Sequence, residues 1–257
     1  MTKTISVFNQ KGGVGKTTTN INLSTYLAKM GKKILVVDAD PQGNTTSGLG
    51  IDKEILDLSL YDGLINEEAC EDIKIKTHFE NLDLVPSKPE LAGAEIEMTA
   101  MKDREIRLRK FLEGCKNKYD FIFIDCPPSL GLISLNALAA SDSILVPIQC
   151  EYYALEGVSQ LMNTVNLVKR GLNNPLHIEG IIMTMFDGRT NLSLQVVDEV
   201  CGYFGEQVYK TVIPRNVRLA EAPSHGLSIV EYDDRSKGAE AYEALAKEFL
   251  GRTEMKQ

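Results

Sequence analysis

The sequence has few cysteines, no long apolar run and no low-complexity tract, and each of these absences excludes a class of protein. No segment approaches the roughly 18 unbroken apolar residues of a membrane span. No basic-then-apolar leader precedes the first predicted strand, so a secretory signal is not expected. With 43% hydrophobic and 25% charged residues, the composition is that of an ordinary soluble globular protein.

The five cysteines are an odd number, are scattered, and include no Cys-x-x-Cys pair. This distribution argues against a disulfide framework and against a zinc site, and it fits a reducing cytoplasm. We therefore predict a cytoplasmic protein. The cysteines are Cys70, Cys115, Cys126, Cys150 and Cys201.

Positive charge is in the minority, because 28 Lys and Arg residues face 36 Asp and Glu residues. The net charge of −8 argues against bulk affinity for nucleic acid. A local basic patch remains compatible with this excess, since binding depends on where the charges lie.

The segment 9–19 reads Asn-Gln-Lys-Gly-Gly-Val-Gly-Lys-Thr-Thr-Thr and joins a predicted strand to a predicted helix. Residues 5–8 alternate as a buried strand does. Over 20–30, Leu23 and Leu27 share the spacing of a buried helix face. A glycine-rich turn between a strand and a helix is the context of a phosphate-binding loop.

The residue types in this loop suit a nucleoside triphosphate. Glycines let backbone N–H groups turn towards a phosphate, and the helix N-terminus adds the positive end of its dipole. Lys16 would reach the β- and γ-phosphates, and the hydroxyl of Thr17 would ligate Mg²⁺.

The loop departs from the standard pattern G-x-x-x-x-G-K-[ST], because Gln10 stands where the first glycine would be. A second lysine, Lys11, is followed by the adjacent glycines Gly12 and Gly13. Since Lys16 already serves the phosphates, Lys11 is either a solvated loop lysine or a charge offered to a nucleotide bound by a second subunit.

Two apolar runs end in carboxylates. The run 121–124 leads into Asp125, which is expected to hold Mg²⁺ through water if the phosphate loop lies on the neighbouring strand. The run 34–37 leads into Asp38 and Asp40. These two either orient or deprotonate a water beside the γ-phosphate or serve as turn formers, and position alone does not decide.

Basic residues gather in loops of the C-terminal half, namely Arg189, Arg215 and Arg218, with Lys210 nearby. Taken singly, such surface arginines are usually solvated. If the loops converge, they form a basic patch that binds phosphate backbones without sequence preference and in a salt-sensitive way.

Apolar strands alternate with helical segments along the chain, which indicates an α/β fold with a mainly parallel twisted sheet and helices on both faces. No linker or internal repeat is visible, so residues 1–257 are assigned to one domain. The predicted helices are 20–30, 55–70, 91–101, 105–116, 152–169, 192–204 and 237–250. The predicted strands are 5–8, 34–37, 73–75, 82–85, 121–124, 143–148 and 178–185, and 208–227 is predicted to be irregular.

Four segments, in this order, resemble the ParA/Soj chromosome-partitioning ATPases. These belong to the deviant Walker A class of P-loop proteins, to which MinD is related. The match spans nearly the whole chain and implies a three-layer P-loop NTPase fold. The segments are Lys11-Gly-Gly-Val-Gly-Lys-Thr, Asp38-Ala-Asp-Pro-Gln, Phe121-Ile-Phe-Ile-Asp-Cys-Pro-Pro-Ser and Pro214-Arg-Asn-Val-Arg-Leu-Ala-Glu-Ala-Pro.

The resemblance implies an ATP-dependent sandwich dimer in which Lys11 reaches the phosphates of the opposite subunit and Gly12 marks the close approach of the two loops. It implies catalytic roles for Lys11, Lys16 and Asp40, the last being needed for hydrolysis. It places Thr17 on Mg²⁺, beside the Asp125 that its strand position already assigns to the ion. The residues implied to cradle the phosphates are Gly13, Val14, Gly15, Lys16, Thr17 and Thr18.

Further positions are implied by the same resemblance. Pro214 and Asn216 match residues that border the adenine. Arg189 and Arg218 match residues that bind double-stranded DNA without sequence preference, in the ATP dimer alone. Doubling the patch in a dimer would let an acidic chain bind DNA.

The implied function is a switch in chromosome or plasmid segregation, with ATP and Mg²⁺ as cofactors. The ATP dimer would bind the nucleoid, and a ParB/Spo0J-like partner would stimulate an otherwise slow hydrolysis. The lack of a DNA-binding extension before residues 1–4 favours the short, chromosomal-type form.

Two alternatives stay open. A MinD-like membrane-positioning ATPase would end in a basic amphipathic helix, whereas the tail 248–257 is mixed in charge and its apolar face is better used for packing. No membrane partner is therefore expected. A nucleotide-gated regulatory module acting on a replication initiator is the second alternative.

Overall fold

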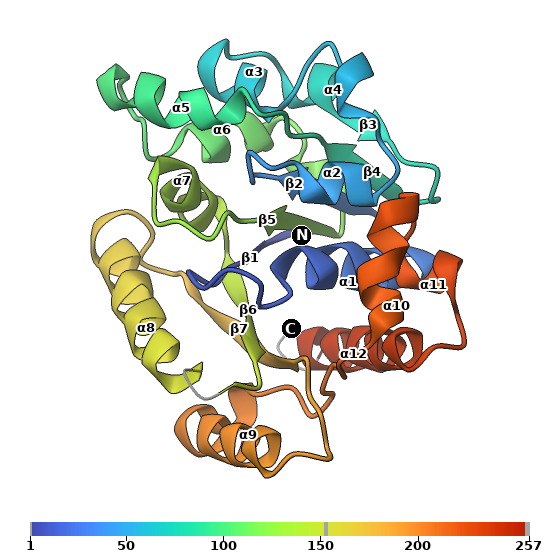
Figure 1. The fold of residues 1–257 in the computed structure, drawn as a ribbon. Helices are drawn as coiled ribbons and strands as arrows, with labels where there is room; N and C mark the ends of the chain where they lie inside the picture. The colour runs from blue at the N-terminus through green and yellow to red at the C-terminus, as the bar shows by residue number, and fades with distance from the viewer. Residues whose placement is uncertain (1, 152–153, 255–257) are drawn as a thin grey trace.

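The structure is a computed structural model and describes residues 2–151 and 154–254 (Figure 1). Over these residues, a seven-stranded sheet has the order β3-β4-β2-β5-β1-β6-β7. The strand pairings are parallel, except that β3 and β4 are antiparallel. The strands are β1 (Lys3–Val7), β2 (Ile34–Asp38), β3 (Ile75–Lys76), β4 (Leu82–Val85), β5 (Phe121–Asp125), β6 (Ser143–Gln149) and β7 (His177–Thr184).

Helices cover both faces of the sheet (Figure 1). They are α1 (Lys16–Lys29), α2 (Asn44–Gly48), α3 (Leu60–Ile65), α4 (Cys70–Ile73), α5 (Leu91–Glu97), α6 (Arg107–Glu113), α7 (Leu132–Ala140), α8 (Ala154–Gly171), α9 (Asn191–Phe204), α10 (Val217–Glu221), α11 (Ile229–Tyr232) and α12 (Lys237–Glu254). Short 3₁₀ turns include η2 (Met98–Ala100) and η5 (Ala222–His225).

The two hydrophobic cores lie on opposite faces of the sheet because side chains alternate along each strand. In β2, Leu35 and Val37 join the core under α5, α6, α7 and α8, whereas Ile34 and Val36 join the core under α1 and α12. The predicted α/β fold, with a mainly parallel sheet and helices on both faces, is confirmed.

The register of the central strands brings Asp38 and Asp125 together at the carboxyl-terminal edge of the sheet. Asp125 is the register partner of Val7 on β1 and of Asp38 on β2. β5 therefore lies between the strand that leads into the glycine-rich loop and the strand that leads into Asp38. In such sheets, ligands bind at the carboxyl ends of the strands.

Some predicted elements are wrong in extent. The continuous helix over 55–70 is broken, because Ser59 and Asp62 form a capping box that starts α3 at Leu60. The segment 208–227 contains the short helix α10, and α2, α7 and α11 were not predicted. Residues 152 and 153 of the predicted helix 152–169 lie outside the described residues, and α8 ends at Gly171.

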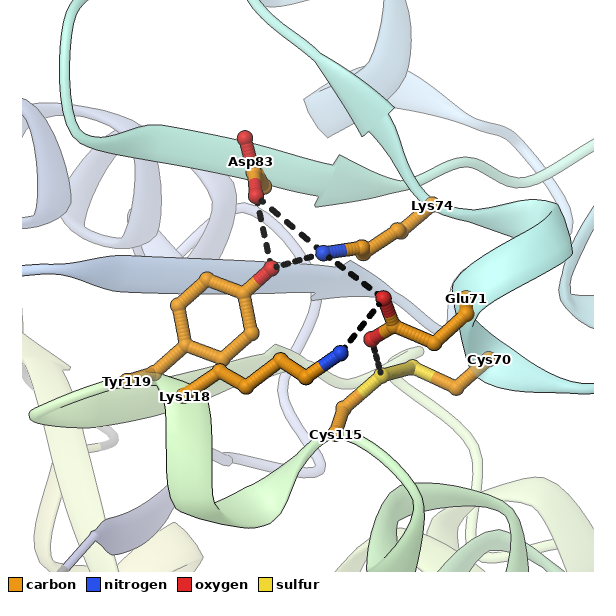
Figure 2. The surroundings of a disulfide bond; sticks show 7 residues. All are labelled: Cys70, Glu71, Lys74, Asp83, Cys115, Lys118 and Tyr119. Carbon is orange, nitrogen blue, oxygen red and sulfur yellow. Dashed lines mark hydrogen bonds and ion pairs between the residues drawn. A yellow bond between two sulfur atoms is a disulfide. The ribbon is translucent and has the colours of Figure 1, made fainter.

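The prediction that the cysteines form no disulfide is wrong. Cys70, at the start of α4, and Cys115, just after α6, form a disulfide bond across 45 residues (Figure 2). Both are buried, at 2% and 0% exposure. Sequence spacing could not reveal the pair, because the packing of the α3–α4 segment against α6 brings the two residues together.

Ion pairs and a buried hydroxyl surround the bridge (Figure 2). Glu71 pairs with Lys118 at 2.8 Å and with Lys74 at 3.3 Å, and the Tyr119 hydroxyl donates to Asp83 at 2.6 Å. Burial, together with this bond to Asp83, raises the pKa of Tyr119. The segment from α4 to β4 is thus tied to the residues just before β5.

Opening the disulfide is expected to destabilise the fold. A bridge that closes a loop of this length restricts the unfolded chain by about 2–4 kcal/mol. Replacing Cys70 and Cys115 together by alanine should lower the free energy of unfolding by about that amount in urea denaturation. Dithiothreitol should destabilise the wild type and leave the double variant unchanged. The control Cys201→Ala, at an exposed free cysteine, should behave as wild type, and a wild type indifferent to dithiothreitol would contradict the prediction.

Candidate functional site

The glycine-rich loop after β1 is held in shape by its neighbours. Asn9 donates from Nδ2 to the Pro147 carbonyl at 2.8 Å and accepts from the Lys11 N–H at 3.0 Å. Thr184, the last residue of β7, donates to the Val14 carbonyl at 2.8 Å. The ends of β6 and β7 therefore fix the loop that β1 leads into.

Glycine is required within this loop by backbone geometry. Gly13 and Gly15 have φ angles of +73° and +88°, in the left-handed region that other residues rarely adopt. Gly15 is followed at once by Lys16, the first residue of α1. The loop thus delivers the chain directly into a helix N-terminus, where anions bind favourably.

Lys16 folds back over its own loop and is almost completely buried, at 7% exposure. Its Nζ donates to the Lys11 carbonyl at 3.1 Å. Burial lowers the pKa of Lys16, against the opposing influence of Asp125, Cys126 and Asp40. A cation hydrogen-bonded to a loop carbonyl can redirect its N–H groups to a phosphate that enters the loop.

Asp125 ends β5 and is fully buried. Its Oδ2 accepts from the hydroxyls of Thr17 at 2.7 Å and Thr45 at 2.8 Å. Its Oδ1 has no hydrogen-bond partner among the described residues. Burial raises the pKa of Asp125, while the two hydroxyls and Lys16 oppose that rise.

The pair Thr17 and Asp125 fits a magnesium ion, because both supply hard oxygen atoms and Oδ1 of Asp125 has no donor in the part of the chain that the structure describes. In the described part of the chain, no group of three His, Cys, Asp or Glu residues could hold a metal. Mg²⁺ does not need one, since it commonly takes one or two protein ligands and keeps waters and phosphate oxygens.

The two aspartates after β2 have different surroundings. Asp38 is fully buried, and its Oδ2 accepts from the backbone N–H and the hydroxyl of Thr46 at 2.7 Å each. Burial, with the charge of Asp125 acting in the same direction, raises the pKa of Asp38. Asp38 therefore holds the chain at the start of α2.

Asp40 is less enclosed, at 8% exposure. Its Oδ1 accepts from the Gln42 N–H at 2.9 Å, and Ser87 donates to its backbone carbonyl at 2.7 Å. Its Oδ2 accepts no hydrogen bond from the described residues. Of the two aspartates, Asp40 is the one with a carboxylate oxygen able to bind a water.

The residues that depart from the standard motif contact other elements. Gln10 donates from Nε2 to Thr164 of α8 at 2.9 Å. The Nζ of Lys11 lies 3.4 Å from Glu151, and both side chains are partly exposed. Gly12 lies against the loop after β5, where a Cβ would be 4.0 Å from Pro128.

A cavity of about 330 Å³ opens beside the loop. Gly15 and Thr18 line it on one side, and Pro214 and Asn216 line it on the other. The side-chain oxygen of Asn216 accepts from the Arg218 N–H at 2.8 Å and so caps α10. The structure therefore brings the proposed adenine-bordering residues next to the proposed phosphate cradle.

The arginines of the predicted basic patch come from different elements. Arg189, in the loop after β7, binds Asp187 through two hydrogen bonds of 2.9 and 2.7 Å, which lower the pKa of Asp187 to about 2. Arg218, on α10, pairs with Glu221 at 2.9 Å and with Asp233 at 3.4 Å. Each cation is thus already paired within its own chain.

The comparisons with known proteins agree on the family. A family model described as an AAA domain matches residues 2–178. The sporulation initiation inhibitor protein Soj of Bacillus subtilis strain 168 is 59% identical over 248 residues, which are 96% of this chain and 98% of that protein. The chromosome partitioning protein ParA of Myxococcus xanthus is 53% identical over 96% of this chain and 88% of its own. The chain belongs to the ParA/Soj family.

Solved structures give the same fold. The crystal structure of cobyrinic acid a,c-diamide synthase from Mycobacterium smegmatis with bound ADP and magnesium is 34% identical, with a TM-score of 0.88 over 100% of this chain and 97% of its own. The cell division ATPase MinD of Pyrococcus furiosus is 29% identical, with a TM-score of 0.81 over 98% and 99% of the two chains. The resemblance to ParA/Soj and the P-loop fold are confirmed.

The C-terminal helix bears on the membrane alternative. Leu245 and Phe249 of α12 are fully buried, and Phe249 packs edge-on against Phe121 of β5 at 5.3 Å between ring centroids. The apolar face of this ParA/Soj chain's α12 is therefore used inside the fold. Across the described residues, the helices are too short or too polar to span a bilayer.

Sequence reasoning missed three hydroxyl residues around the aspartates: Thr45 and Thr46 donate to carboxylates, and Ser87 donates to the backbone carbonyl of Asp40. Thr45 and Thr46 follow the turn after Asp40, and short hydroxyl side chains near a turn are a recognisable signal for hydrogen bonding to nearby groups. Their partners on other strands were not readable from the chain.

The left-handed geometry of Gly15 leads to a stability prediction. Gly15→Ala should lower the free energy of unfolding by about 1–2 kcal/mol through backbone strain, since its Cβ would otherwise meet only Thr184, at 3.7 Å. Gly251→Ala is the matched control, because Gly251 lies within α12 with open space around it. That change should stabilise by about 0.5–1 kcal/mol. Equal urea midpoints for Gly15→Ala and wild type would show that the loop is not strained.

Proposed function

We propose that this ParA/Soj chain is a Mg²⁺-dependent ATPase that works as a dimerising switch in chromosome or plasmid segregation. The observation that carries the proposal is the meeting of Lys16, Thr17 and Asp125 around the glycine-rich loop. Further support comes from the 34% identical M. smegmatis protein, which was crystallised with an ATP analogue and magnesium.

Each residue of the site has a separate role in ATP hydrolysis. The loop from Gly12 to Thr18, with the N-terminus of α1, cradles the phosphates, and Lys16 binds the β- and γ-phosphates. Thr17 and Asp125 hold Mg²⁺, which neutralises charge that develops on the phosphates. Asp40 orients the attacking water with its available oxygen. Pro214 and Asn216 border the adenine in the adjacent cavity.

Lys11 completes the site of a second subunit. In this chain it pairs with Glu151, a contact between partly exposed groups that is weak in water. We assign to the ATP dimer an exchange in which Lys11 leaves Glu151 for the phosphates of the opposite subunit. Gly12 permits the close approach of the two loops, since it carries no side chain.

The ATP dimer binds double-stranded DNA through Arg189 and Arg218, without sequence preference. Each arginine must exchange an acidic partner in its own chain for a phosphate. Two subunits double the number of phosphate contacts, which lets a chain of net charge −8 bind a polyanion. A ParB/Spo0J-like partner stimulates the slow intrinsic hydrolysis, and the ADP form leaves the nucleoid.

A regulatory role is the second candidate. It is favoured by the name of the 59% identical B. subtilis relative, which describes an inhibitor of sporulation initiation. In that role, the same nucleotide-gated dimer would act through a contact with another protein, such as a replication initiator, rather than through movement of DNA.

The Asp40→Ala variant tests the switch. Without the water-orienting carboxylate, the ATP dimer should persist, so this variant should bind non-specific duplex DNA with ATP and not with ADP. Binding should fall steeply over a salt series, because phosphate contacts release counterions. Lys16→Ala is the control that should bind neither nucleotide nor DNA. An intact ATP dimer without DNA binding would overturn the DNA assignment.

The arginines can be tested in the Asp40→Ala background. Arg189→Ala and Arg218→Ala should each weaken DNA binding roughly tenfold and lower the slope of log affinity against log salt by about 1 per lost contact. Dimer formation by size-exclusion chromatography should be unchanged. The matched control is Arg104→Ala, an exposed, acid-paired arginine in the loop before α6. If both variants keep the affinity of the control, the DNA surface lies elsewhere.

A further inference from the structure

Helix α2 places two adjacent threonines on two buried carboxylates from neighbouring strands. The hydroxyl of Thr45 donates to Oδ2 of Asp125 at 2.8 Å, and the hydroxyl of Thr46 donates to Oδ2 of Asp38 at 2.7 Å. Asp38 and Asp125 are register partners on β2 and β5. Consecutive residues therefore bind both of the paired strand ends.

The position of Thr45 is fixed by the packing of α2. Gly43 makes the turn before the helix with a φ angle of +61°. Gly48, at the end of the helix, lies so close to Ile21 of α1 that a Cβ would be 2.6 Å from it. Thr45 itself is fully buried, so water has no access to replace its hydroxyl.

The hydrogen bonds of Asp125 divide its carboxylate unequally. Oδ2 receives both hydroxyls, whereas Oδ1 has no donor among the described residues. Thr17 belongs to the phosphate loop and is a metal ligand in the proposed function. Thr45 comes from a separate segment, five residues after Asp40, and its hydroxyl donates to this carboxylate. It therefore fixes the carboxylate's rotation independently of whether Thr17 engages a metal.

We infer that Thr45 is a positioning residue for the magnesium site, acting through Asp125. This inference rests on the proposed ATPase function. A hydroxyl that fixes this carboxylate determines how well it is aligned for the ion or for a water bound to the ion, and loss of such a partner typically weakens metal affinity by 10–100-fold. The same hydroxyl links Asp125 to the chain segment that carries Asp40.

The test is a magnesium titration of nucleotide binding, which does not depend on turnover. Binding of a fluorescent, slowly hydrolysed ATP analogue is measured in EDTA and over increasing Mg²⁺, for wild type and for Thr45→Val. The variant should need about tenfold more Mg²⁺ for half-maximal gain in affinity, while its affinity in EDTA stays within twofold of wild type. Thr45→Ser, which keeps the hydroxyl, should restore the wild-type midpoint.

Ser47→Ala is the matched control, because Ser47 lies on the same helix and donates to the Gly43 carbonyl rather than to a carboxylate. It should leave the Mg²⁺ midpoint unchanged. If a thermal unfolding experiment shows that Thr45→Val is not folded, Thr45→Ala is measured in the same way.

The possible results separate the inference from the function on which it rests. A folded variant lacking the hydroxyl with a wild-type Mg²⁺ midpoint would overturn the inference, and so would an equal loss of affinity in EDTA. A wild-type protein whose nucleotide binding does not respond to Mg²⁺ would instead overturn the proposed function.

Discussion

The fully buried carboxylate of Asp125 is the group on which the rest of the site depends. A carboxylate removed from water is strongly unfavourable unless hydrogen-bond donors and positive charge replace its hydration. Thr17 and Thr45 supply the donors, and Lys16 supplies the positive charge. The phosphate loop and helix α2 are therefore positioned by one acidic side chain at the carboxyl end of the central strand β5.

The neighbouring carboxylate of Asp38 has different hydrogen-bond partners from those of Asp125 and Asp40. Asp38 is the register partner of Asp125, but Thr46 supplies it with two donors, and the Asp40 N–H approaches its other oxygen at 3.3 Å. Both oxygens of Asp38 accept hydrogen bonds within the fold. Asp125 and Asp40, by contrast, each keep one carboxylate oxygen that accepts no hydrogen bond from the described residues. The Asp-x-Asp spacing thus separates Asp38, whose two oxygens both accept hydrogen bonds, from Asp40, whose Oδ2 accepts none from the described residues. The difference arises because the strand ends at the first aspartate and the second lies in the loop.

The sequence predicted what depends on neighbours along the chain. Apolar runs such as 121–124 and the spacing of Leu23 and Leu27 identify strands and a helix because those patterns reflect burial on a local period. Interactions between distant segments were not predictable in this way. Thr45 and Asp125 are 80 residues apart, and Cys70 and Cys115 are 45 apart. Their pairing depends on strand order and helix packing, which no local pattern encodes.

The cations assigned to other molecules share one property, which gives the proposed switch its physical basis. Lys11, Arg189 and Arg218 each pair with an acid of their own chain, through contacts at least partly open to solvent. Exchanging one such acid for a phosphate changes little, because exposed ion pairs are weak on either side of the exchange. A net gain arises only when several exchanges occur on one polyanion at once, since later contacts form at high effective concentration. A dimer that aligns two sets of arginines meets that condition, and a single subunit with a net negative charge does not.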